Sequence, residues 1–340
     1  MAAEGQIDLQ DGAAGIALLH ASRGERDAAL ELVDRAEDAL GALPLPPGLF
    51  TGVAGVAWCG DQVRALLGED EPERNEPVDE LLAAHLDRAD WPFDYDLASG
   101  LVGFGLYALG RGERGRSIAE RAVVHLARFA REDEDGVGFF TPPELLPAHQ
   151  REVAPDGLYN LGVAHGGAGA IGLLAGCVAA GFAVARARAL LDPAVAWLLA
   201  RRRPDGFPIA HGVDSPVVDG WCHGAPGIAL VLDAAGRAAG VTAWCEQALA
   251  IAREAAARVG ESAGPGGLCH GAAGLGYIFR RLGRDDAALA TAGDLLLERA
   301  AVLPVGAGDP GFLTGDAGAG LALARQGGSW FRFFLAGGPL

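Results

Sequence analysis

The sequence predicts an all-α fold in which two concentric layers of helices close into an α/α toroid. Three observations predict it. A Gly-x-x-Gly segment followed by an apolar run recurs seven times, at intervals of 40 to 66 residues that are typical of repeat proteins. Ala- and Leu-rich stretches with a helical period separate these segments. His and Cys residues stand at corresponding points of different repeats, which favours closure around one shared site over an open solenoid.

The segment after each glycine pair is expected to form an inner helix. These segments are rich in small residues and almost free of charge, as helices buried on all sides are. Glycine supplies the backbone freedom for a tight turn into the helix and lets helix ends crowd together near an axis. The repeats begin at Gly12, Gly52, Gly100, Gly166, Gly224, Gly271 and Gly315.

The stretches between the repeats are expected to form amphipathic outer helices. Clear examples are residues 117–131, 184–201, 242–259 and 285–303. The longest interval contains residues 136–158 with four prolines, and it is expected to be an extended excursion over the mouth of the toroid. No stretch resembles an interdomain linker, so residues 1–340 are predicted to form a single domain.

The charge balance excludes several classes of function. The 340 residues carry 27 basic and 44 acidic side chains, which give a formal net charge of −17. All the basic residues are Arg, which excludes Schiff-base chemistry and a P-loop lysine. An acidic surface repels a phosphate backbone, so nucleic acid is not an expected partner.

The apolar stretches and the cysteines indicate the cellular setting. No run of about 18 apolar residues is free of Gly, Arg or Asp, and Met1–Asp11 contain no basic region before an apolar one. Spanning helices and a secretory signal are therefore disfavoured, and a cytoplasmic location is expected. The five cysteines, an odd number, are expected to be free thiols or metal ligands rather than a disulfide framework.

Two repeats carry a Cys-His pair directly before the glycine. Because equivalent positions of a closed repeat converge on its axis, Cys222, Cys269 and His270 are expected to meet. Two thiolates and one imidazole suit zinc, and three protein ligands leave a fourth position open, as in catalytic zinc sites. The alternative, that these cysteines are small buried hydrophobes, is weakened by their shared repeat position. Three further cysteines lack that position and are expected to be core or surface residues: Cys59, Cys177 and Cys245.

Three more polar residues are candidates for a site on the same axis. His165 stands at the repeat position of His270, so it is either a proton carrier in the cavity or a histidine satisfied in the core. His223 is either a second polar group near the metal or a support for a ligand. Asp96 precedes the third repeat, where an acidic cap of the following helix is a complete structural explanation.

These motifs together resemble the lanthionine synthetase C family. The resemblance covers nearly the whole chain and combines the seven Gly-x-x-Gly repeats with three segments in a fixed order: Asn160–Gly166, Trp221–Gly227 and Leu268–Gly271. The family contains the cyclases of lanthipeptide biosynthesis and the eukaryotic lanthionine synthetase C-like proteins. It implies an α/α toroid of seven inner and seven outer helices, with Zn²⁺ held by Cys222, Cys269 and His270.

The resemblance also implies an activity and partners. Cyclases of the family activate a peptide cysteine as a thiolate, which adds to a dehydroalanine or dehydrobutyrine and forms a thioether ring. By motif, His165 matches the acid/base histidine of the family and Asp96 matches its motif aspartate. The implied partners are a dehydrated precursor peptide, a lanthipeptide dehydratase and a transporter.

The sequence departs from the peptide cyclases of the family in three ways. Val218 stands where an Arg precedes the first zinc cysteine by four residues, and His223 replaces a Tyr, as in the eukaryotic relatives. That histidine could serve as the proton donor. The outer helix that should open the toroid is expected to be absent or supplied by the aromatic segment 330–340. Two other functions stay open: addition of glutathione to dehydrated proteins, and a non-catalytic peptide-binding toroid.

Overall fold

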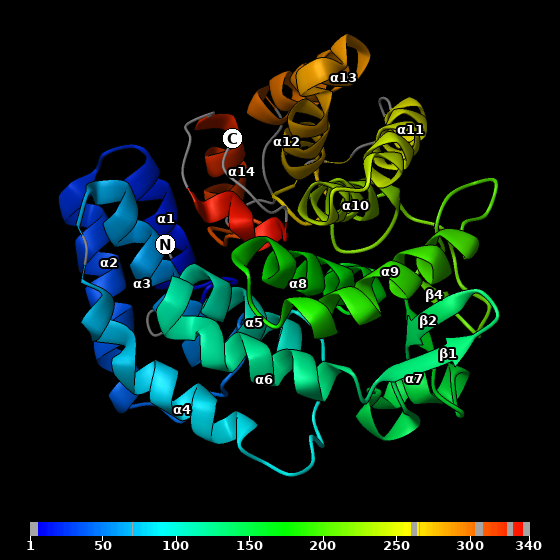
Figure 1. Ribbon diagram of the computed structural model, residues 1–340. Coiled ribbons are helices and arrows are strands. Elements are labelled where there is room, and N and C mark those ends of the chain that lie inside the picture. Colours follow the sequence, from blue (N-terminus) through cyan, green and yellow to red (C-terminus); the bar gives the residue numbers. More distant parts are fainter. Residues whose placement is uncertain are drawn as a thin grey trace. The chain divides into compact units, whose positions relative to one another are not determined.

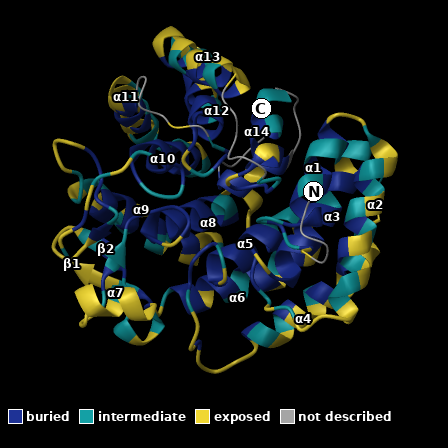
Figure 2. Cartoon of the chain, turned by 180° about the vertical axis from the view of Figure 1, so that it is seen from behind, coloured by how far each residue is buried: buried dark blue, intermediate teal, exposed yellow. Residues whose placement is uncertain are grey.

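The computed structural model describes residues 6–69, 71–259, 264, 266–302, 309–324 and 329–335, and these are mainly helical (Figure 1). Each of the seven Gly-x-x-Gly segments leads directly into an α-helix, which confirms the predicted inner helices. They are α1 (Ala13–Ser22), α3 (Val53–Leu67), α5 (Leu101–Gly110), α8 (Gly167–Ala180), α10 (Ala225–Ala239), α12 (Ala272–Leu282) and α14 (Asp316–Ala324). Figure 2 shows α5, α8 and α10 as largely buried.

The second glycine of the repeat is required by a close backbone approach. In six repeats, a Cβ atom on this glycine would collide with the carbonyl oxygen of the residue six positions earlier. The distance would be 1.8 Å between Gly55 and Leu49, and 2.3 Å between Gly169 and Val163. In these six repeats the loop before the inner helix therefore folds back onto the first turn of that helix, and only glycine leaves room for it.

The helices between the inner ones are amphipathic, with one buried and one exposed face (Figure 2). They are α2 (Arg26–Asp38), α4 (Glu76–Leu86), α6 (Arg116–Leu126), α9 (Val184–Ala200), α11 (Thr242–Val259) and α13 (Ala287–Val302). The helix expected over residues 117–131 ends early, because Arg131 pairs with Gly138 in a hairpin. The helix expected from residue 285 begins later, where the Asp286 carboxylate accepts hydrogen bonds from the Ala288 and Leu289 N–H groups. Residue 303 lies outside the described residues.

The contacts of the chain divide it into two compact units. Unit 1 holds the described residues up to Leu82 and from Ala256 to Phe333, and unit 2 holds Ala83–Ala255 with Phe334 and Leu335. In unit 1, α1 packs on α2, α3 and α14, and α12 packs on α13 and α14. In unit 2, α8 packs on α5, α9 and α10, and α5 packs on α6. None of the helices in the described part of the chain has the length and apolarity to cross a bilayer.

The aromatic segment near the C-terminus forms a short 3-10 helix, Ser329–Phe334. In unit 1 the ring of Phe333 lies 5.0 Å from that of Phe312, 5.7 Å from Phe50 and 6.1 Å from Trp58. In the described residues, this segment therefore adds to the core and does not build an outer helix before α1. Residues 336–340 of the expected covering segment lie outside the described residues.

The proline-rich excursion is more regular than its composition predicts. Strands β1 (Ala130–Asp133) and β2 (Gly136–Phe139) form an antiparallel hairpin, followed by α7 (Ala148–Val153). Strand β3 (Tyr159–Asn160) then pairs with β4 (Ala210–His211). The excursion thus ends at Asn160, directly before the loop that leads into α8.

Candidate active site and metal ligands

The loops before the inner helices carry all the candidate residues. In each loop a buried residue precedes the first glycine by three positions, as Val163 and Trp221 do. Within unit 2 the Ala164 N–H donates to the Cys222 carbonyl at 3.2 Å, and within unit 1 the Cys269 N–H donates to the Leu313 carbonyl at 2.9 Å. These pairs occupy the same position of neighbouring repeats. Equal positions are therefore aligned by backbone hydrogen bonds, which explains why sequence spacing could predict the candidates.

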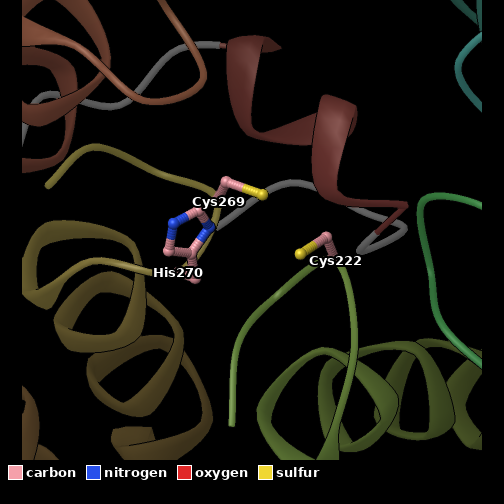
Figure 3. A group of neighbouring side chains, drawn as sticks. All are labelled: Cys222, Cys269 and His270. Carbon is pink, nitrogen blue, oxygen red and sulfur yellow. The ribbon is translucent and has the colours of Figure 1, made fainter. Parts of the chain in front are cut away.

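The three predicted metal ligands lie together. The Sγ atoms of Cys222 and Cys269 and a ring nitrogen of His270 are all within 4.8 Å of one another (Figure 3). Zinc bonds to sulfur and nitrogen are about 2.0–2.3 Å long, so donor atoms this close can share one ion after small side-chain rotations. The two thiols and the imidazole are also the donor types that zinc favours. The residues present therefore fit a zinc ion.

A tight turn holds Cys222 in place. The Gly220 N–H donates to the His223 carbonyl at 2.9 Å, which closes the turn around the cysteine. Gly224 has a φ of 101°, and a Cβ atom there would lie 1.8 Å from the Val218 carbonyl oxygen. Glycine is therefore required at this position for both conformation and space. Val218, at the position where the resemblance leads one to expect an arginine, is 39% exposed and brings no charge to the turn.

The Asp96 carboxylate has two separate roles. Its Oδ1 accepts hydrogen bonds from the Ser99 and Gly100 N–H groups at 2.8 and 3.0 Å, which shapes the loop before α5. Its Oδ2 accepts a hydrogen bond from His165 Nδ1 at 2.6 Å. Asp96 can therefore cap the loop before α5 through one oxygen and hold His165 through the other, so its structural and functional roles are compatible.

His165 is oriented by that hydrogen bond. Its side chain is 47% exposed, while that of Asp96 is only 5% exposed. Burial acts to lower the pKa of His165, but the hydrogen bond that its ring donates to Asp96 and the charges of Asp96 and Asp94 raise this pKa above the ordinary value. Since Nδ1 donates to Asp96, Nε2 is the nitrogen of neutral His165 that can accept a proton.

A second carboxyl group lies beside this pair. Asp94 Oδ1 accepts hydrogen bonds from the Tyr95 and Asp96 N–H groups at 2.7 and 3.3 Å. Burial, together with the charge of Asp96, raises the pKa of Asp94 from 3.8 to about 6. Asp94 therefore takes up a proton near neutral pH more readily than an ordinary aspartate.

His223 lies beside His165, with the two ring centroids 5.9 Å apart. Asn160 Nδ2 is 3.4 Å from His223 Nε2. A Cβ atom on Gly162 would lie 2.6 Å from the edge of the His223 ring, so glycine allows the ring to pack there. Sequence reasoning did not single out Asn160, although the residue opens the motif that ends at His165 and Gly166.

The three cysteines that do not stand at the repeated position before an inner helix have surroundings that differ from those of Cys222 and Cys269. Cys59 and Cys177 are buried, and burial raises the pKa of both thiols, that of Cys177 to about 12. Cys245 is half-buried, and its thiol lies 3.6 Å from the Asp233 carbonyl, to which it donates. These surroundings keep all three thiols protonated near neutral pH.

Comparisons with known proteins agree with the predicted fold. Residues 4–327 match the family described as "Lanthionine synthetase C-like protein". The chain is similar to a solved structure of "Nisin cyclase", with a TM-score of 0.79 and 22% sequence identity over 98% of this chain and 92% of that chain. This likeness confirms the predicted fold class, an all-α α/α toroid. No curated protein matches the sequence.

Proposed function

This chain belongs to the lanthionine synthetase C-like family, and from that membership we propose that it is a zinc-dependent peptide cyclase. It adds cysteine thiolates of a dehydrated precursor peptide to dehydroalanine or dehydrobutyrine, which forms lanthionine or methyllanthionine rings. The observation that supports this most is the group of two thiols and one imidazole within 4.8 Å. Three protein ligands leave a zinc coordination position open for a substrate, as catalytic sites do.

The chain's own residues account for the proton movements. Zinc held by Cys222, Cys269 and His270 would supply positive charge that favours the thiolate form of a substrate cysteine. His165 takes the thiol proton on Nε2, while Asp96 holds its Nδ1 and stabilises the charged ring. This arrangement makes His165 a base whose orientation is fixed before substrate arrives.

His223 completes the addition as the proton donor. When the sulfur bonds to the β-carbon, the electron pair of the carbon–carbon double bond moves toward the adjacent carbonyl and leaves an enolate. His223, whose ring centroid is 5.9 Å from that of His165, gives a proton to the α-carbon. No atom is lost from the peptide, so the product has the mass of the substrate.

The reaction requires an upstream partner. Dehydroalanine and dehydrobutyrine arise by loss of water from Ser and Thr, so a dehydratase must supply the peptide. We further propose a cytoplasmic enzyme that hands its product to a transporter. The net charge of −17 would favour a peptide with basic segments.

The test uses a synthetic peptide with one cysteine and one dehydroalanine. Cyclisation consumes the thiol without changing the mass, so a thiol-alkylating reagent followed by mass spectrometry separates the ring from the linear peptide. We expect zinc-loaded protein to protect the peptide from alkylation, and His165→Ala to slow this by about 10²-fold or more. A reaction no faster than the peptide alone would contradict the proposal.

The same assay separates the other two functions. A peptide with dehydroalanine but no cysteine is incubated with glutathione, and an adduct with the added mass of glutathione would indicate intermolecular thiol addition. A peptide that binds with no product from either nucleophile would indicate a non-catalytic peptide-binding toroid. Either result alone, without ring formation, would replace the cyclase proposal.

A further inference from the structure

The side-chain amide of Asn160 has one possible orientation. Its Oδ1 accepts a hydrogen bond from the Gly162 N–H at 2.8 Å. A backbone N–H group can only donate, so the amide oxygen must be the atom that faces Gly162. The NH₂ group of Asn160 is then the part that faces His223, with Nδ2 at 3.4 Å from Nε2.

This orientation selects one form of the imidazole. An amide NH₂ group can only donate, so His223 Nε2 must be the acceptor and carry no hydrogen. In a neutral imidazole the hydrogen is then on Nδ1. We infer that Asn160 is a positioning residue that holds neutral His223 in the Nδ1–H tautomer.

The packing of the ring supports the same orientation. A Cβ atom on Gly162 would lie 2.6 Å from His223 Cδ2, the ring carbon next to Nε2. The Cδ2–Nε2 edge of the ring therefore faces the turn formed by Asn160 and Gly162. Across the residues that the structure describes, His223 Nδ1 makes no hydrogen bond, so its hydrogen is available for donation.

The two histidines then differ in the atom they offer. His165 Nδ1 donates to Asp96, which leaves Nε2 as an acceptor. His223 Nε2 accepts from Asn160, which leaves Nδ1–H as a donor. For this division of roles the inference rests on the proposed function, in which His165 takes a proton and His223 gives one. A neutral imidazole keeps its single N–H hydrogen, so His223 gives a proton from Nδ1 only after its ring has gained a second proton. The tautomer itself does not depend on that function.

Nitrogen NMR of the zinc-loaded full chain tests the tautomer without substrate. The protein is labelled with ¹⁵N-histidine and studied at about pH 8, above the ordinary histidine pKa. The His223 signals are assigned by their loss in His223→Gln. We expect Nε2 to give the shift of an unprotonated ring nitrogen and Nδ1 that of a protonated one. The reverse assignment in the wild-type chain would overturn the inference, and this result requires no altered Asn160.

Asn160→Asp tests the cause with little change in shape. An aspartate keeps the oxygen that accepts from Gly162 N–H, but it presents an acceptor to His223 in place of a donor. We expect His223 Nε2 to become protonated in this variant. Gln150→Glu, the same amide-to-acid change on α7, should leave the His223 signals unchanged. An unprotonated Nε2 in folded Asn160→Asp would contradict the role of Asn160.

Kinetics distinguish failure of this inference from failure of the proposed function. With the cysteine- and dehydroalanine-containing peptide, Asn160→Asp should lower kcat about tenfold or more with KM unchanged, as expected of a residue that acts through His223 and not by binding substrate. A wild-type chain with the expected tautomer but no cyclisation would leave the inference in place and reject the function. An altered tautomer with unchanged kcat would reject the positioning role alone.

Discussion

At the scale of single residues, the carboxyl group of Asp94 makes folding depend on pH. Its pKa of about 6 in the folded chain exceeds the ordinary value of 3.8. The folded state therefore binds this proton more tightly than the unfolded state, so stability falls as the pH rises from about 4 to about 6 and stays lower above that.

Asp94→Asn should remove this dependence. The amide oxygen can still accept from the Tyr95 and Asp96 N–H groups, but no buried charge forms. We expect the variant to exceed the wild type in unfolding free energy by up to about 3 kcal/mol at about pH 8, with the difference vanishing near pH 4. Urea unfolding at both pH values measures this, with the exposed Asp205→Asn as the control. Equal stabilities at the higher pH would contradict the account.

Asp96→Asn should change His165 directly. The amide can keep the oxygen that accepts from Ser99 and Gly100, but it then presents an NH₂ group to His165 Nδ1. The pKa of His165 should fall, since the hydrogen bond and charge that raise it are lost. NMR titration of the His165 ring measures this, and cyclisation should slow by about 10²-fold. A variant with an unchanged His165 pKa would show that Asp96 does not control the ring.

Sequence spacing predicted part of this site. Cys222 and Cys269 occupy one position of the repeat, and His165 and His270 occupy the next, so the repeat alone aligns them. The contact of Asn160 with His223 depends on how the turn at Gly162 folds, which spacing does not specify. The raised pKa of Asp94 also required the structure, because it arises from burial beside Asp96.

At the scale of the elements, the second glycine of six of the repeats is a packing requirement. A Cβ atom on Gly169 would lie 2.3 Å from the Val163 carbonyl oxygen, whereas one on Gly167 in the same helix would have its nearest neighbour at 3.7 Å. Gly169→Ala should therefore destabilise the chain by about 1–3 kcal/mol. Gly167→Ala should be neutral or stabilise it by up to about 1 kcal/mol. Chemical unfolding measures both, and equal stabilities would contradict the packing account.

The inner helices were predictable because their signal is local. At all seven repeats the glycine pair marks where the inner helix begins, and the uncharged apolar run that follows predicts that this helix is buried. Strand β1 was not predicted, because its four residues are mostly polar and exposed. Residues distant in sequence hold this strand in place. Asp133 accepts a hydrogen bond from the Trp197 indole of α9 and forms an ion pair with Arg201, which directly follows that helix.

At the scale of the whole molecule, we propose that the chain is one domain. In the described residues, two boundaries between the units fall inside the continuous helices α4 and α11, and the third falls inside the 3-10 helix Ser329–Phe334, so none lies in a linker. We therefore expect a single unfolding transition. Trp58 belongs to unit 1 and Trp197 to unit 2, so fluorescence reports on both, and circular dichroism should give the same midpoint. Two separate transitions would show that the units fold independently.

The central claim is that residues at equivalent positions of different repeats form a zinc site. Elemental analysis of the purified, unchelated chain tests this claim most directly. We expect about one zinc per chain in the wild type and in Cys245→Ala, a cysteine outside the repeat position. Cys222→Ala, Cys269→Ala and His270→Ala should lose the metal while keeping their helical circular dichroism spectra. A folded wild type without zinc, or unchanged zinc in all three ligand variants, would contradict the account.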